Sequence, residues 1–235
     1  MSTPVLCFPP AGAGASFFHP WLGHRQDLRV VPVQLPGRER RLAEEECTDL
    51  DSLMATIVPE LRAEIGDAER VVVFGHSYGA LLAYETVRRL SEQAPGIALT
   101  LVVSGSNRPG TPRAGRVTGL PDDEFVAGVA DIAGYRHPAL DEPELRELLL
   151  PTLRTDVAMH ENYRHTATGP LDVPVLAVRG RSDDLVSAAE LAEWREITSA
   201  GFTRAEIDGG HMYLVDGWAA LLDLVAGATV AGVAS

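Results

Sequence analysis

Ser77 lies between two glycines in the segment FGHSYGALLAYE, residues 74–85. An apolar, β-branched run ends just before it and helical spacing begins just after it, so the serine occupies a strand-to-helix turn. Gly75 and Gly79 carry no side chain, which lets a strand and a helix pass closely on either side of a strained residue. Such a turn exposes the serine hydroxyl at a helix N-terminus, where amides favour developing negative charge. The alternative interpretation is an ordinary turn in which Ser77 caps the helix.

A serine nucleophile needs a base, and the base needs a carboxylate that orients it. Asp183 and Asp184 follow a buried apolar run, and His211 lies in a glycine-flanked loop ahead of an apolar helix. The spacing GxxDxxV favours Asp183 as the acid, and Asp184 stays open as the alternative. We therefore predict a catalytic triad of Ser77, Asp183 and His211, in the order serine, acid, histidine.

An oxyanion formed by attack of Ser77 would need two backbone N–H donors. The amide of Tyr78 is one candidate, and the glycine-rich segment CFPPAGAGAS, residues 7–16, supplies the other. Pro9 and Pro10 have no N–H, so Ala11 is the first available donor. The segment could alternatively bind phosphate, but it lacks the further glycine and the acidic residue of a dinucleotide site.

The remaining histidines and cysteines are interpreted as structural. His76 adjoins the nucleophile, and we expect it to support the turn, since neighbouring side chains at a tight turn point apart. No histidine pair has metal-binding spacing, so we assign neither a metal nor a cofactor. Cys7 and Cys47 are too few for a disulfide framework and are predicted to be free thiols.

Apolar runs of strand length alternate with stretches of helical spacing along the chain. The predicted strands are 4–8, 29–33, 70–74, 99–103, 173–178 and 203–207, and the predicted helices are 50–65, 80–93, 188–199 and 213–225. Continuous apolar strands are typical of a parallel sheet buried on both faces. The alternation predicts an α/β fold with a mostly parallel central sheet flanked by helices.

One segment interrupts this alternation, at about 108–165, where no convincing strand occurs. It contains two helical patterns with acidic first turns, at 120–135 and 140–163. We interpret it as a helical lid inserted over the sheet. The whole chain, 1–235, is predicted to form one domain, which suits its length.

Composition narrows the possible partners and the cellular location. The formal net charge of −13 argues against nucleic-acid binding, which needs a basic face. The N-terminus has no basic region, and no apolar run reaches the ~20 residues that span a bilayer. We expect a cytoplasmic protein that does not bind a membrane, and we expect a monomer.

Several segments together resemble the type II thioesterases of polyketide and nonribosomal peptide biosynthesis, members of the α/β-hydrolase superfamily. The resemblance covers about residues 5–215 and is carried by CFPPAGAGASFFHPW, VQLPGRERR, VFGHSYGALLAYE, LPTLRTD, ENYRH, PVLAVRGRSDDLV and GGHMYL. It implies hydrolysis of aberrant or stalled acyl groups from the phosphopantetheine arm of acyl or peptidyl carrier proteins, in pathways such as antibiotic biosynthesis. Matched by position, Ser77 is the nucleophile, His211 the base and Asp183 the acid, with Ala11 and Tyr78 supplying the oxyanion hole.

The chain differs from the common residues of this family at three places. Tyr78 stands where methionine is common, which would narrow or polarise the acyl pocket, and Pro10 stands where histidine is common. In the lid, GYRHP, residues 134–138, replaces a shorter glycine-proline turn. These differences concern substrate preference and leave the chemistry unchanged.

The resemblance implies that carrier domains are the partners. Arginines could contact an acidic carrier in one of two clusters, although solvated surface arginines are an equal alternative. The clusters are Arg38, Arg40 and Arg41, and Arg108, Arg113 and Arg116. Two rival functions are a small-molecule serine esterase of the same fold that acts without a carrier, and a non-catalytic relative that binds a ligand.

Overall fold

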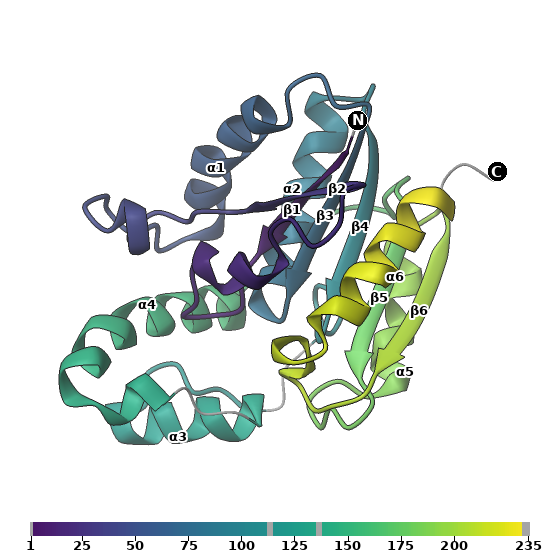
Figure 1. Ribbon diagram of the computed structural model, residues 1–235. Helices are drawn as coiled ribbons and strands as arrows, with labels where there is room; N and C mark the ends of the chain where they lie inside the picture. The colour runs from purple at the N-terminus through teal and green to yellow at the C-terminus, as the bar shows by residue number, and fades with distance from the viewer. Residues whose placement is uncertain (1, 112–114, 135–137, 232–235) are drawn as a thin grey trace.

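A parallel six-stranded sheet forms the centre of the computed structural model, which describes residues 2–111, 115–134 and 138–231 (Figure 1). The strands are β1 (Thr3–Phe8), β2 (Leu28–Pro32), β3 (Arg70–His76), β4 (Ala98–Ser104), β5 (Val175–Gly180) and β6 (Phe202–Ile207). Their order is β2-β1-β3-β4-β5-β6, and every pairing between them is parallel. All six predicted strands and the parallel sheet are confirmed.

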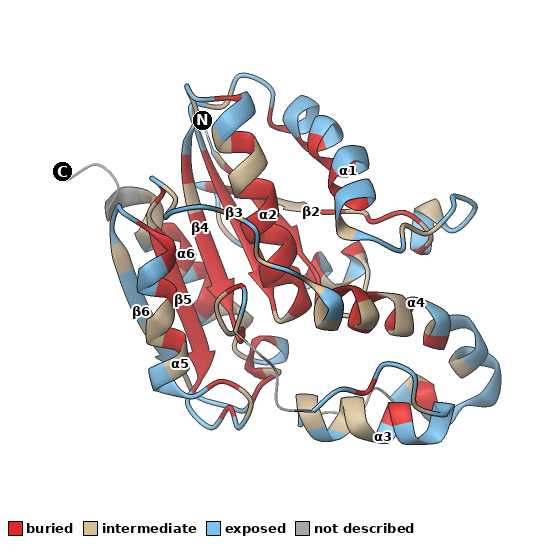
Figure 2. Ribbon diagram, turned by 180° about the vertical axis from the view of Figure 1, so that it is seen from behind, coloured by how far each residue is buried: buried red, intermediate tan, exposed pale blue. Residues whose placement is uncertain are grey.

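The central strands are apolar on both faces because helices cover both faces. Val71, Val72, Val73 and Phe74 of β3 are each at most 1% exposed, although their side chains alternate between faces. Figure 2 shows this buried centre in β3, β4 and β5 and in helix α2 (Tyr78–Gln93), which packs against them. The continuous apolar runs of the sequence therefore reflect two-sided burial.

Helices α1 (Leu50–Ile65) and α2 (Tyr78–Gln93) pack on one face with α5 (Ala188–Ala192) and the 3-10 turn η4 (Glu193–Ile197). The other face is covered by η1 (Ala15–Trp21) and α6 (Trp218–Ala231). Short 3-10 turns also form at η2 (Glu39–Arg41) and η5 (Tyr213–Val215). No helix in the described chain combines the length and apolar composition required to cross a membrane.

Two predicted helices differ from the observed ones. The expected helix 188–199 begins with a capping box of Ser187 and Glu190 but changes to 3-10 geometry after Ala192. There the indole of Trp194 turns inward and donates to the carbonyl of Ser106 at 2.7 Å. The expected helix 213–225 starts only at Trp218, after the 3-10 turn η5.

The segment between β4 and β5 lies beyond the carboxyl ends of the strands (Figure 1). It contains α3 (Asp122–Ala133), the 3-10 turn η3 (Pro138–Asp141) and α4 (Pro143–Asn162), close to the two helices expected from the sequence. Its apolar side chains form a small cluster of their own, which includes Val117, Phe125, Val126, Leu140, Leu150, Leu153 and Val157. This segment and the sheet thus face each other at the end where parallel strands usually place a site. Residues 135–137 of GYRHP lie outside the described residues.

Candidate active site

Ser77 connects β3 to α2 in a backbone conformation that side chains rarely adopt, with φ 54° and ψ −116°. Such a conformation costs about 1–3 kcal/mol and persists only where the surroundings enforce it. Its amide is held by the carbonyl of Ser104 on the neighbouring strand, at 2.8 Å. The side chain makes no capping hydrogen bond to α2, so the alternative interpretation of Ser77 as a helix cap is wrong.

The two glycines around Ser77 are required by close contacts. A Cβ on Gly75 would lie 1.9 Å from the carbonyl oxygen of Gly79, one turn further on. A Cβ on Gly79 would lie 2.3 Å from the carbonyl oxygen of Phe8, at the end of β1. The absence of side chains therefore brings the serine turn against the loop that follows β1, as the sequence motif predicts.

His211 and Asp183 meet although they lie on loops after different strands. The Nδ1 atom of His211 is 3.0 Å from Oδ2 of Asp183, and both side chains are buried. The other oxygen of Asp183 accepts from the amides of Leu185 and Val186, at 2.9 and 3.2 Å. Asp184, the alternative acid, is exposed and points to no such partner within the described residues.

These contacts keep the Asp183 carboxylate ionised. Burial by itself would raise its pKa, but the hydrogen bond with His211 and those from the Leu185 and Val186 amides lower it below the ordinary value. Because an ionised carboxylate can only accept, Nδ1 of His211 carries a proton, and in a neutral imidazole this leaves Nε2 as the acceptor. The ring is thereby in the tautomer that a general base requires.

His76 is buried beneath this pair and hydrogen-bonded on one side. Its Nδ1 lies 2.8 Å from Oγ of Ser104, which in turn lies 2.6 Å from the hydroxyl of Tyr213. Its ring centroid is 4.8 Å from that of His211. Burial and the proximity of His211 hold the pKa of His76 well below its ordinary value, so His76 packs as a neutral ring and supports the turn.

The two backbone N–H groups predicted to bind an oxyanion donate to no acceptor among the described residues. Tyr78 is the first residue of α2, so its N–H has no acceptor inside the helix. The N–H of Ala11 donates to none of the described residues. The Tyr78 ring, by contrast, is buried under α4, where its hydroxyl donates to Sδ of Met159 at 3.1 Å. The expectation that this ring narrows the pocket is therefore wrong, because it lies outside the cavity lining.

Ser77, His211 and Ala11 all line one cavity of about 670 Å³. The segment between β4 and β5 supplies many of the apolar side chains of its wall, including Val117, Val126, Val129, Ile132, Leu140, Leu149, Leu153 and Val157. A polar site therefore opens onto an apolar chamber, which suits a substrate with a reactive polar group and a hydrocarbon part.

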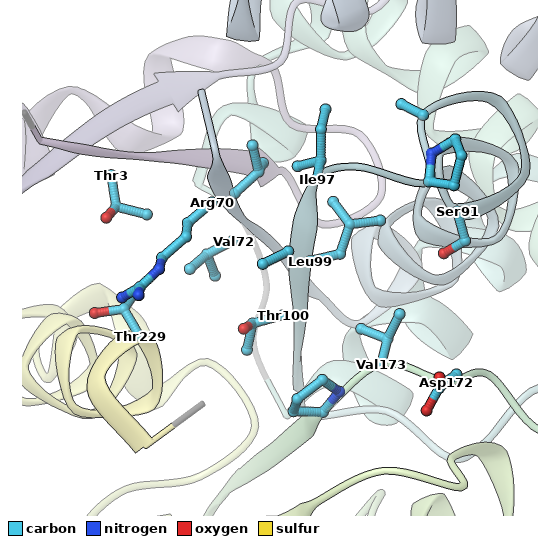
Figure 3. Close-up of a pocket in the computed structure, with 15 residues that line it drawn as sticks. Thr3, Arg70, Val72, Ser91, Ile97, Leu99, Thr100, Asp172, Val173 and Thr229 are labelled. Carbon is cyan, nitrogen blue, oxygen red and sulfur yellow. The ribbon is translucent and has the colours of Figure 1, made fainter. Parts of the chain in front are cut away.

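A second cavity of about 400 Å³ lies at the opposite end of the sheet (Figure 3). It is lined by Thr3 and Arg70 at the strand starts, by Ser91 of α2 and by Asp172 before β5. None of the predicted site residues reaches it.

Most arginines of the two clusters considered for docking pair with acidic residues of this chain. Arg38 is only 8% exposed and pairs with Asp156, whereas Arg40 is exposed. Arg41, Arg108 and Arg116 each pair with glutamates of this chain. Arg113 lies outside the described residues.

Asp156 is a residue to which the sequence reasoning gave no role. It lies in the LPTLRTD segment, and its carboxylate is 1% exposed and contacts the loop after β1. Asp156 is part of the LPTLRTD motif noted in the sequence, but no local pattern predicts which distant groups an aspartate on a helix will contact.

Comparison with known proteins agrees with this geometry. The Thioesterase domain family matches residues 3–228. The gramicidin S biosynthesis protein GrsT of Aneurinibacillus migulanus is 31% identical over 214 residues, which cover 90% of this chain and 83% of that protein. Thioesterase PikA5 of Streptomyces venezuelae is 35% identical over 216 residues, covering 91% of this chain and 76% of PikA5. The solved structure of the type II thioesterase BorB from the borrelidin biosynthetic cluster is 35% identical with a TM-score of 0.85, covering 97% of this chain and 92% of BorB. The chain therefore belongs to the thioesterase domain family, with the α/β-hydrolase fold.

Proposed function

We propose that this thioesterase is an editing enzyme that hydrolyses acyl groups from the phosphopantetheine arm of carrier proteins in polyketide or nonribosomal peptide assembly. The observation that carries the proposal is the strained Ser77 turn, which opens with His211 onto an apolar chamber. The printed names of the relatives, BorB, PikA5 and GrsT among them, support the same class of pathway.

In the proposed reaction, Nε2 of His211 accepts the hydroxyl proton as Oγ of Ser77 bonds to the thioester carbonyl carbon. The carbonyl oxygen takes up the electron pair and binds the amides of Ala11 and Tyr78. As the carbonyl re-forms, the carbon–sulfur bond breaks and His211 returns the proton to the departing pantetheine sulfur. Asp183 stabilises the imidazolium that exists between these two transfers.

Deacylation repeats the sequence with water in place of the serine. His211 takes one proton from water, the oxygen bonds to the acyl carbon, and the proton returns to Oγ of Ser77 as the acid leaves. The apolar wall excludes bulk water from the acyl chain, while the narrow pantetheine arm carries the reacting bond to the serine.

Mass spectrometry of a carrier protein tests this proposal. A carrier loaded with acetyl, propionyl or longer acyl-phosphopantetheine is incubated with wild type, with Ser77→Ala, or with Ser91→Ala as a control serine in the distant cavity. We expect wild type and Ser91→Ala to strip the acyl group, whereas Ser77→Ala loses turnover on the order of a millionfold. Hydrolysis of simple esters without any hydrolysis of acyl carriers would contradict the carrier proposal and favour a small-ester hydrolase.

A further inference from the structure

The carboxylate of Asp156 joins three parts of the chain that are distant in sequence. Its Oδ2 accepts from the backbone N–H of Gly12 and from Nη1 of Arg38, each at 2.8 Å, and its Oδ1 accepts from Nη2 of Arg38 at 2.8 Å. Asp156 belongs to α4, Gly12 to the loop after β1, and Arg38 to the loop after β2. Both charged side chains are almost fully buried.

Arg38 makes further contacts that fix its position. Its Nη1 also donates to the carbonyl of Ala13 at 3.0 Å, and its Nη2 lies 3.3 Å from Oε1 of Glu46. The other oxygen of Glu46 accepts from the hydroxyl of Thr155, next to Asp156 on α4. A buried ion pair of this kind adds little net stability compared with an apolar pair, so its value lies in the geometry that it imposes.

That geometry bears on the amide of Ala11. The N–H of Gly12 is committed to Asp156, and the N–H of Ala13 donates to the carbonyl of Pro10 at 3.1 Å. The peptide groups on both sides of Ala11 are thus held, while the Ala11 N–H itself remains available to the cavity. A small rotation of this backbone would turn the donor away from a developing oxyanion, which needs donors at about 2.7–3.1 Å.

We propose that Asp156 is a positioning residue that, through Gly12 and Arg38, fixes the Ala11 amide for oxyanion binding. The inference rests on the proposed serine mechanism but not on the identity of the leaving group. Because α4 also forms a wall of the acyl chamber, the same helix that contacts the acyl chain holds the oxyanion donor in place.

The first test is Asp156→Asn, which keeps the shape but has one acceptor where the carboxylate has two. Complete loss of an oxyanion donor costs about 10²–10³ in kcat, so misalignment should cost about tenfold or more, with KM nearly unchanged. The matched control is Asp122→Asn, which alters an exposed carboxylate that pairs with Arg154 of α4 and contacts neither Gly12 nor Arg38, and we expect it to keep the wild-type kcat.

A second measurement separates positioning from a general loosening of the site. A trifluoromethyl ketone analogue of the acyl pantetheine forms a covalent oxyanion adduct with Ser77, whereas the corresponding thioether binds only as the ground state. We expect the inhibition constant of the ketone to rise in Asp156→Asn by the same factor as kcat/KM falls. The dissociation constant of the thioether should be the same in Asp156→Asn as in wild type. Equal weakening of both analogues would overturn the proposal.

A double variant covers the case in which Asp156→Asn does not fold. Arg38→Met with Asp156→Leu replaces the buried ion pair by apolar side chains, an exchange that is often neutral or stabilising. We expect a folded protein with the same loss of kcat, and wild-type kcat in this variant would overturn the inference.

All variants are assayed on p-nitrophenyl acetate as well as on the acyl carrier protein, since the oxyanion forms with both substrates. Failure of the carrier assay in wild type would then contradict the proposed substrate without affecting the test of Asp156.

Discussion

At the scale of single residues, hydrogen bonds to both oxygens of one carboxylate orient the site. Asp183 has one oxygen bonded to His211 and the other to two backbone amides, which hold the carboxylate in one orientation. The lowered pKa of Asp183 expresses the same contacts, because they favour the ionised form. Orientation of His211 and stability of the fold are therefore linked through one side chain.

The pH dependence of stability follows from that lowered pKa. A carboxylate with a lowered pKa in the folded state stabilises the fold fully above its unfolded pKa of about 3.9, and this stabilisation is lost as the pH falls through the folded value. We predict that Asp183→Asn unfolds at lower urea concentration than wild type near neutral pH, and that the difference shrinks below about pH 4. A difference independent of pH would contradict this. Asp184→Asn, at the exposed neighbour, should match wild type throughout.

The same substitution tests the role of Asp183 in the reaction. Without the carboxylate, His211 no longer has its Nδ1 proton held in place, and the tautomer needed at Nε2 is lost. We predict a fall in kcat on the order of 10⁴-fold for Asp183→Asn, measured by thiol release from acyl-pantetheine at neutral pH. Undiminished turnover in Asp183→Asn together with a large loss in Asp184→Asn would reverse the assignment of the acid.

At the scale of elements, the site depends on how closely β1, β3 and α2 approach one another. The serine turn touches the end of β1 at Phe8, and the loop that follows β1 presents Ala11 to the cavity. A close contact between the first turn of α2 and the end of β1 therefore brings Ser77, the proposed nucleophile, near Ala11, the proposed oxyanion donor. The strain at Ser77 is held by this packing.

We predict that Gly79→Ala disturbs both stability and catalysis. Its Cβ would lie 2.3 Å from the carbonyl oxygen of Phe8, and backbone cannot yield as a flexible side chain can. Overpacking of this kind costs about 1–3 kcal/mol in the free energy of unfolding, and the displaced loop should lower kcat as well. Gly96→Ala is the control, since a Cβ there meets no atom within 4 Å. Urea denaturation and thiol release measure the two effects, and wild-type values in Gly79→Ala would contradict the contact.

At the scale of the whole molecule, the segment between β4 and β5 lies over the carboxyl ends of the strands and lines the chamber into which Ser77 opens. Its apolar cluster supports α3 and α4 beyond the strand ends, and the same helices supply much of the apolar wall of the cavity that Ser77 lines. Most arginines of the two predicted clusters pair with acidic residues of the chain, whose net charge is −13.

We predict that a larger side chain at Val129 shortens the acyl chains that the enzyme accepts. Val129 of α3 lines the chamber, so Val129→Trp fills volume without touching Ser77 or His211. Differences of a few methylene groups in an apolar pocket change kcat/KM by about 10–200-fold, so long acyl groups should lose at least tenfold relative to acetyl. Leu145→Trp, on an exposed position of α4 outside the cavity lining, is the control. An unchanged chain-length profile in Val129→Trp would contradict the assignment of the chamber.

The strands, most of the helices and the serine motif could be predicted from the sequence, because they depend on local periodicity and on glycine at tight contacts. The apolar runs predicted all six strands, and GHSYG identified the strained turn at Ser77. Helix ends were less accurate where a single buried group, such as Trp194, changed the local geometry.

The contacts between side chains that are distant in sequence became visible only in the folded structure. Asp183 and Asp184 are neighbours with the same chemistry, and the fold turns only Asp183 toward His211. Arg38 was expected at the surface. It is buried instead and pairs with Asp156 of α4, which is distant in the sequence. Hydrogen bonds and ion pairs act through space over a few ångströms, so their partners are set by how the elements pack and not by spacing along the sequence.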